Sequence, residues 1–193
     1  WAIFSLAVSV CGFGALLIGF MPTPDLARVW WRIAHVGVIG IPVLFYHFVL
    51  AFVGARRPLA VRAAYAVGAA FLLADATPLF IEPMRQVFGQ FYYDSPPPPL
   101  YVLFVACFLG LVALSEVELW RGLRRARDRA QRGLIRWFLV GTSVGFLGGA
   151  TSFLPVFGLY VYPHGNFAVA LFTLIMTFAF LRYRLVRVNV RPS

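Results

Sequence analysis

The stretch Arg121–Arg136, RGLRRARDRAQRGLIR, determines how the chain is arranged. It contains seven of the 17 arginines, and the chain has no lysine. Two apolar runs flank it, at residues 100–119 and 137–155. Positive charge beside a membrane-spanning helix stays on the cytoplasmic side, because moving it across the bilayer is costly. We therefore expect two transmembrane helices that are joined on the cytoplasmic side.

The composition indicates a membrane protein along its whole length. Of the 193 residues, 61% are hydrophobic and only 12% are charged, and the mean hydropathy is +0.82. Soluble domains have roughly 25% charged residues. Because helices satisfy their own backbone hydrogen bonds in lipid, we predict an all-α polytopic transmembrane helix bundle that forms a single domain over residues 1–193.

The net charge of +10 has a simpler explanation than a nucleic-acid partner. Fourteen arginines fall at predicted cytoplasmic helix ends, whereas Arg28, Arg32 and Arg85 fall in outer loops. This asymmetry is typical of membrane topology, so we expect no nucleic acid. Membrane lipids, including anionic headgroups, are the expected partners, at roughly 1 kcal/mol per basic residue near the surface.

Six stretches have about the length that a spanning helix needs. The predicted spans are residues 1–20, 35–53, 59–78, 100–119, 137–155 and 167–181. The chain then starts on the inside, and its C-terminus is cytoplasmic. A further segment is expected to precede Trp1, which already lies within an apolar run.

Three features are expected between these spans. Residues 25–34 should form a short helix along the outer surface, with Trp30 and Trp31 at the lipid–water interface. The long outer loop, residues 79–99, should carry an aromatic belt and a stiff polyproline piece at residues 96–99. The fourth helix should continue beyond the bilayer, because its charged residues have helical spacing in the pairs Glu118–Arg121, Arg124–Asp128 and Asp128–Arg132. Glu116 and Glu118 are both expected to pair with arginines.

No catalytic motif or metal-binding pattern is present in the sequence, so ionisable residues inside spans are the candidate sites. Asp75 is either a hydrogen-bonded acid at a helix end or a residue that senses a ligand or a proton. His47 is either a hydrogen-bonded packing residue or an axial ligand of a haem or (bacterio)chlorophyll. His35 and His164 map to the outer surface, where they could flank a cofactor or ligand pocket together with Asp75. We expect no catalysis by this chain.

Glycines recur every four residues in the fifth span, at Gly141, Gly145 and Gly149. Small residues at this spacing let another helix approach closely. We therefore predict a helix-packing surface, with a cofactor lying against it as the alternative.

The order of several short motifs in the second half resembles the N-terminal seven-transmembrane region of bacterial sensor histidine kinases. The residues that carry the resemblance are Arg132-Gly133-Leu134-Ile135-Arg136, Gly141, Gly145–Gly149, Ser152-Phe153-Leu154-Pro155, Tyr162-Pro163-His164-Gly165-Asn166 and Arg182-Tyr183-Arg184-Leu185. The run Pro42–Leu50 is similar to the third helix of that region. The resemblance implies seven spans, so a helix upstream of Trp1 or a lost helix is expected. It also implies the bacterial inner membrane.

Two functions remain open at this point. The resemblance implies a non-catalytic sensor or anchor module, since the sequence shows no phosphoacceptor helix and no ATP-binding domain. The alternative is an accessory subunit of a larger photosynthetic or respiratory membrane complex. The expected protein partners are accordingly a second copy of the chain or other transmembrane subunits.

Overall fold

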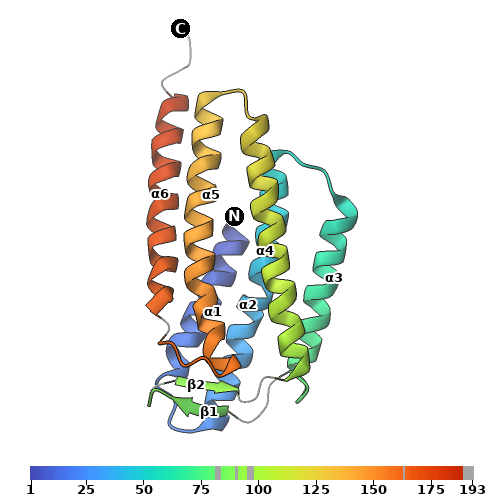
Figure 1. Cartoon of the computed structure of the whole chain (residues 1–193), viewed down its shortest axis with the longest axis vertical. Coiled ribbons are helices and arrows are strands. Elements are labelled where there is room, and N and C mark those ends of the chain that lie inside the picture. Colours follow the sequence, from blue (N-terminus) through green and yellow to red (C-terminus); the bar gives the residue numbers. More distant parts are fainter. Residues whose placement is uncertain (81–83, 90, 95–97, 163, 189–193) are drawn as a thin grey trace. The chain divides into compact units, whose positions relative to one another are not determined.

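The computed structural model describes residues 1–80, 84–89, 91–94, 98–162 and 164–188 (Figure 1). Its elements are mostly helical: α1 (Ala2–Ile18), α2 (Pro24–Val53), α3 (Pro58–Asp75), α4 (Pro99–Arg125), α5 (Arg129–Ala150), the 3-10 helices η1 (Thr151–Phe157) and η2 (His164–Asn166), and α6 (Phe167–Val188). Two short strands, β1 (Met84–Val87) and β2 (Phe91–Asp94), form a hairpin between α3 and α4.

The helical class predicted from composition is confirmed for four spanning helices. Helices α2, α3 and α4, and α5 continued by η1, are long and apolar enough to cross a membrane. Helix α1 and residues 164–179 are apolar but shorter. Six spans therefore stay a prediction, as does the predicted polyproline piece, because residues 95–97 lie outside the described part of the chain.

The chain divides into two compact units, Trp1–Ser115 with Phe153–Tyr162, and Glu116–Ser152 with Pro163–Ser193. The first unit holds α1, α2, α3, the hairpin and most of α4. The second holds the end of α4, with α5 and α6 side by side.

Helix α2 corrects the prediction of a separate surface helix at residues 25–34. The Thr23 hydroxyl accepts a hydrogen bond from the Leu26 amide, and Pro24 fills the first helical position. From there α2 runs unbroken for 30 residues, through Pro42, to Gly54. Gly54 ends it in the left-handed conformation, at φ 71°. The charged first turns are thus an extension of the spanning helix.

Helices α1 and α2 pack closely through small residues. A Cβ atom added at Gly14 would lie 2.7 Å from the Ala34 Cβ, and one added at Gly37 would collide with the backbone of α1 at Ala7 and Cys11. Without side chains at these two positions the helix backbones can approach each other directly. This contact was not predicted, although small residues recur three or four apart in α1 and three apart in α2.

A β hairpin lies within the long outer loop that was expected at residues 79–99. Met84 pairs with Asp94 and Val87 with Phe91. Its turn needs positive φ at Phe88 (58°) and Gly89 (66°), a conformation that is uncommon for a bulky residue. The Arg85 guanidinium lies 4.9 Å from the centre of the Tyr160 ring, and the Phe88 ring contacts Tyr162. The hairpin is thereby attached to the segment after η1.

The end of α4 confirms one predicted ion pair and corrects the others. Helix α4 extends to Arg125, and Arg121 donates to the Glu118 carboxylate at 2.8 Å. Asp128 is not a helical pairing partner, because it caps α5 and accepts from the amides of Ala130 and Gln131. The predicted pairs of Asp128 with Arg124 and Arg132 are therefore wrong.

Candidate functional site

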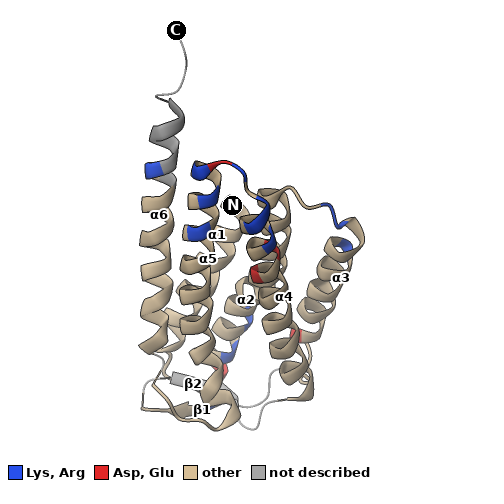
Figure 2. Cartoon of the chain, turned by 45° about the horizontal axis from the view of Figure 1, so that its top comes forward, with Lys and Arg blue, Asp and Glu red and all other residues tan. Residues whose placement is uncertain are grey.

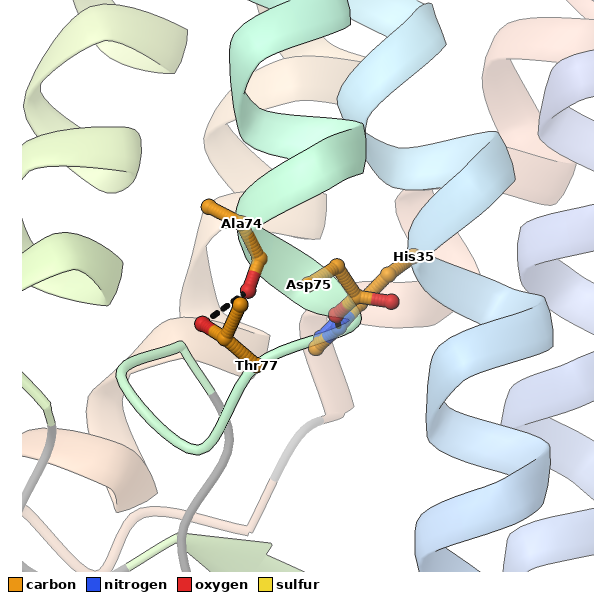
Figure 3. A network of polar contacts seen from close by, with 4 residues as sticks. All are labelled: His35, Ala74, Asp75 and Thr77. Carbon is orange, nitrogen blue, oxygen red and sulfur yellow. Dashed lines mark hydrogen bonds and ion pairs between the residues drawn. The ribbon is translucent and has the colours of Figure 1, made fainter.

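The candidate site is a buried polar pair that joins α2 to α3. His35, in α2, and Asp75, the last residue of α3, are 2% and 6% exposed. The His35 Nδ1 lies 2.6 Å from an Asp75 carboxylate oxygen (Figure 3). An ionised carboxylate can only accept, so when Asp75 is ionised the Nδ1 donates the hydrogen of this bond. Two residues 40 positions apart thus link two spanning helices, at the last residue of α3 and within α2.

Local hydrogen bonds hold the end of α3 in place beside this pair. The Thr77 hydroxyl donates to the Ala74 carbonyl at 2.6 Å, and the Thr77 amide donates to the same oxygen (Figure 3). The Leu79 amide in turn donates to the Thr77 hydroxyl. These bonds satisfy backbone groups that the helix end leaves open. The position of Asp75 is therefore fixed by the turn that follows it.

Aromatic rings surround the His35 imidazole. The ring centres of Trp31, Phe80 and Tyr101 lie 5.4, 5.4 and 5.9 Å from it. Phe80 is fully buried and also contacts Phe71, one turn before Asp75. Such rings exclude water, which strengthens the electrostatic attraction between the paired groups. Phe80 was expected only in the aromatic belt of the outer loop, and its contact with His35 was not predicted.

A small apolar cavity lies next to this cluster, between α2, α3 and α4. Its volume is about 10 Å³, and Ile39, Phe71, Phe104 and Cys107 are among the residues that line it. This volume is at the lower limit for a single water molecule. The cavity is therefore too small for an organic ligand.

The remaining predicted candidates are His164 and His47. His164 is exposed in η2, in the second unit, and the other two outer candidates, His35 and Asp75, lie together in the first unit. His47 is exposed, and its Nδ1 forms a 3.0 Å hydrogen bond with the Tyr65 hydroxyl. A haem or (bacterio)chlorophyll contact at His47 stays a prediction.

The glycines of α5 face α6. A Cβ atom added at Gly141 would lie 3.1 Å from the Ile175 side chain, and one at Gly145 3.0 Å from the Phe172 Cβ. At Gly149 the distance to Val169 would be an ordinary 3.6 Å. Of these three glycines, the first two therefore contact α6 more closely than Gly149 does. The contact is closer still at Gly148, where an added Cβ atom would collide with Ala168 of α6.

A second polar contact joins α4 to α5. The Ser143 hydroxyl donates to one Glu116 carboxylate oxygen at 3.3 Å, while the other oxygen is buried without a hydrogen-bond partner among the described residues. The predicted arginine partner of Glu116 is therefore wrong, because Ser143 on the neighbouring helix takes that place.

The His35–Asp75 pair can exchange hydrogen bonds and protons. Within the described ranges, no group of three or more His, Cys, Asp or Glu side chains could hold a metal ion. The His35–Asp75 pair has a strong internal bond and an apolar surround, which suits a structural link that a competing partner can open.

The chain is similar to a known protein family. A family model described as the N-terminal 7TM region of histidine kinase matches residues 1–189. No curated protein and no solved structure matches the chain. The family region is a sensor module and not a catalytic domain, and its match gives no support to the accessory-subunit alternative. Since the match covers nearly every residue that forms the helices above, the chain belongs to the family of N-terminal seven-transmembrane regions of histidine kinases.

Proposed function

We propose that the chain is the signal-receiving membrane module of a histidine kinase and that the His35–Asp75 pair is part of its input site. The observation that carries this proposal is the pair itself. Ionisable residues inside spanning helices are rare and usually functional, and this pair joins two such helices.

The orientation follows from the arginines. The stretch Arg121–Arg136, which includes the turn between α4 and α5, contains seven arginines and lies on the cytoplasmic side of the bacterial membrane. Helix α6 leads toward the same side. The β hairpin and the His35–Asp75 pair are then at the outer end, where a signal from outside the cell arrives.

The input acts by competition for the pair. A proton or a hydrogen-bonding ligand that engages Asp75 removes the partner of His35. A buried polar group without its partner strongly destabilises the packing around it. The end of α3 and the turn through Thr77 then separate from α2. The movement of α3 is the response that the module passes on.

A fusion of residues 1–189 to a histidine kinase output domain tests this function. Autophosphorylation is measured in inverted membrane vesicles at equal protein levels. Because coupling between distant sites is typically 5- to 150-fold, Asp75→Asn should change basal autophosphorylation by at least about fivefold. The matched control is His47→Gln, which removes an exposed hydrogen bond in the same helix as His35. Equal activity of wild type and Asp75→Asn would contradict the proposal.

A further inference from the structure

The turn between α4 and α5 presents a group of exposed arginines, which we call the arginine surface. It consists of Arg124, Arg125, Arg127, Arg129 and Arg136. Figure 2 shows basic residues gathered where these two helices meet. All five belong to the second unit, so their arrangement depends on this unit alone.

The acidic residues of this stretch do not neutralise the surface. The Glu118 carboxylate is engaged by Arg121 at 2.8 Å. The Asp128 carboxylate is used in capping α5, where it accepts from two backbone amides. In the described part of the chain, no ion pair is formed by the five arginines of the surface. Their charge is therefore available to a partner outside the chain.

The turn that carries these arginines is held in one conformation. The Arg132 guanidinium donates to the Ala126 carbonyl at 3.1 Å, and the Ala126 amide donates to the Gly122 carbonyl at 2.9 Å. Ala126 itself is buried. Only three residues separate α4 from α5, and their hydrogen bonds fix both helix ends. A ligand therefore meets charges that are already positioned, which reduces the entropy cost of binding.

A neighbouring tryptophan indicates that the surface lies at the depth of lipid headgroups. The Trp120 ring, 47% exposed, lies 5.0 Å beneath the Arg124 guanidinium. Tryptophan is enriched where a spanning helix crosses the membrane–water interface. Arg124 and Arg125 follow directly at the end of α4, one of the helices long enough to cross the bilayer.

From this charge, fixed geometry and depth we infer that the arginine surface is a binding site for the phosphodiester headgroups of anionic phospholipids. The planar guanidinium binds phosphate oxygens in pairs and is weakly hydrated, so arginine suits this ligand better than lysine does. The inference is independent of the proposed input site, which lies in the other unit.

The test uses the purified full chain in detergent micelles, titrated with dioleoyl phosphatidylglycerol, with dioleoyl phosphatidylcholine or with inorganic phosphate. Bound lipid is counted by native mass spectrometry, and thermal unfolding is followed in parallel. We expect binding of phosphatidylglycerol and a rise in melting temperature, neither of which the other two additions produce at the same concentration. Arg124→Gln/Arg125→Gln should weaken this binding roughly 25-fold, at about fivefold for each arginine.

The matched control is Arg56→Gln/Arg62→Gln, which removes two exposed arginines at and near the start of α3. This variant should bind phosphatidylglycerol like the wild type. Equal losses of phosphatidylglycerol affinity in the two variants would overturn the inference, because arginines outside the surface would then contribute as much to binding. Equal binding of phosphatidylcholine would overturn it as well, and binding of free phosphate alone would show an anion site that does not recognise lipid. Thermal unfolding without lipid verifies that each variant is folded.

Discussion

The energetic role of the His35–Asp75 pair can be measured by a double-mutant cycle. Asp75→Leu leaves the buried imidazole without its 2.6 Å partner. Removing one member of a buried ion pair typically costs about 3–5 kcal/mol. His35→Phe leaves an unpaired carboxylate and should cost a similar amount. The double variant removes both polar groups and places two apolar side chains in an apolar surround, so it should regain most of the stability of the wild type.

The size of the coupling distinguishes two kinds of interaction. Neutral hydrogen bonds between membrane helices contribute about 0.6 kcal/mol on average and at most about 1.7. Two single costs of at least about 3 kcal/mol each, with a double variant close to the wild type, give a coupling of about 5 kcal/mol or more, which would identify a charged pair. Asp75→Asn, which retains an acceptor oxygen but loses the charge, should fall between the wild type and Asp75→Leu.

The assay is reversible unfolding in mixed detergent and dodecyl sulfate micelles, followed by far-ultraviolet circular dichroism. The control is His47→Phe, which removes the exposed hydrogen bond to Tyr65 and should cost less than about 1 kcal/mol. A coupling below about 1 kcal/mol, or a cost of His47→Phe equal to that of His35→Phe, would refute the reasoning.

Three further predictions concern packing, backbone conformation and topology. Gly145→Leu should lower the melting temperature by several degrees, because its side chain would meet Phe172, whereas Gly110→Leu, with open space around it, should not; equal melting temperatures would contradict this packing. Gly54→Ala should cost about 1–2 kcal/mol of unfolding free energy in the same micelle assay, since φ is 71° and nothing crowds the site; an unchanged stability would show that the turn relaxes. In a cysteine-free background, Arg85→Cys should react with an impermeant thiol reagent in intact cells and Arg127→Cys should not; the reverse pattern would invert the proposed topology.

Hydropathy and charge predicted the helices but not where all of them begin. The six predicted spans overlap the six α-helices, because an apolar run can be recognised in the sequence without knowing which helices pack against it. The start of α2 was misjudged, since Arg28 and Arg32 interrupt the apolar pattern while leaving the helix intact. The cap at Asp128 had a readable signal, because Gln131 follows three residues later, as in a capping box.

The candidate site was only partly predictable for a different reason. The sequence placed His35 and Asp75 near the same membrane surface, since each lies close to the end of a predicted span. Whether they touch depends on how α2 and α3 are rotated about their own axes, which packing determines and sequence spacing does not. The role of Phe80 was hidden for the same reason, because it lies after the end of α3 and reaches His35 only through the fold.

The unbroken length of α2 makes bilayer thickness a variable for this protein. Thirty residues extend about 45 Å, whereas the hydrocarbon core is about 30 Å thick, so about ten residues exceed it. These additional residues lie at the N-terminal end of α2, which carries Arg28 and Arg32 and precedes His35. A thicker bilayer draws Arg28 and Arg32 toward hydrocarbon, and a thinner one brings His35 closer to water. Hydrophobic mismatch therefore acts on the same pair of residues as the proposed ligand would. The lipid composition of the membrane then influences the resting state of this pair.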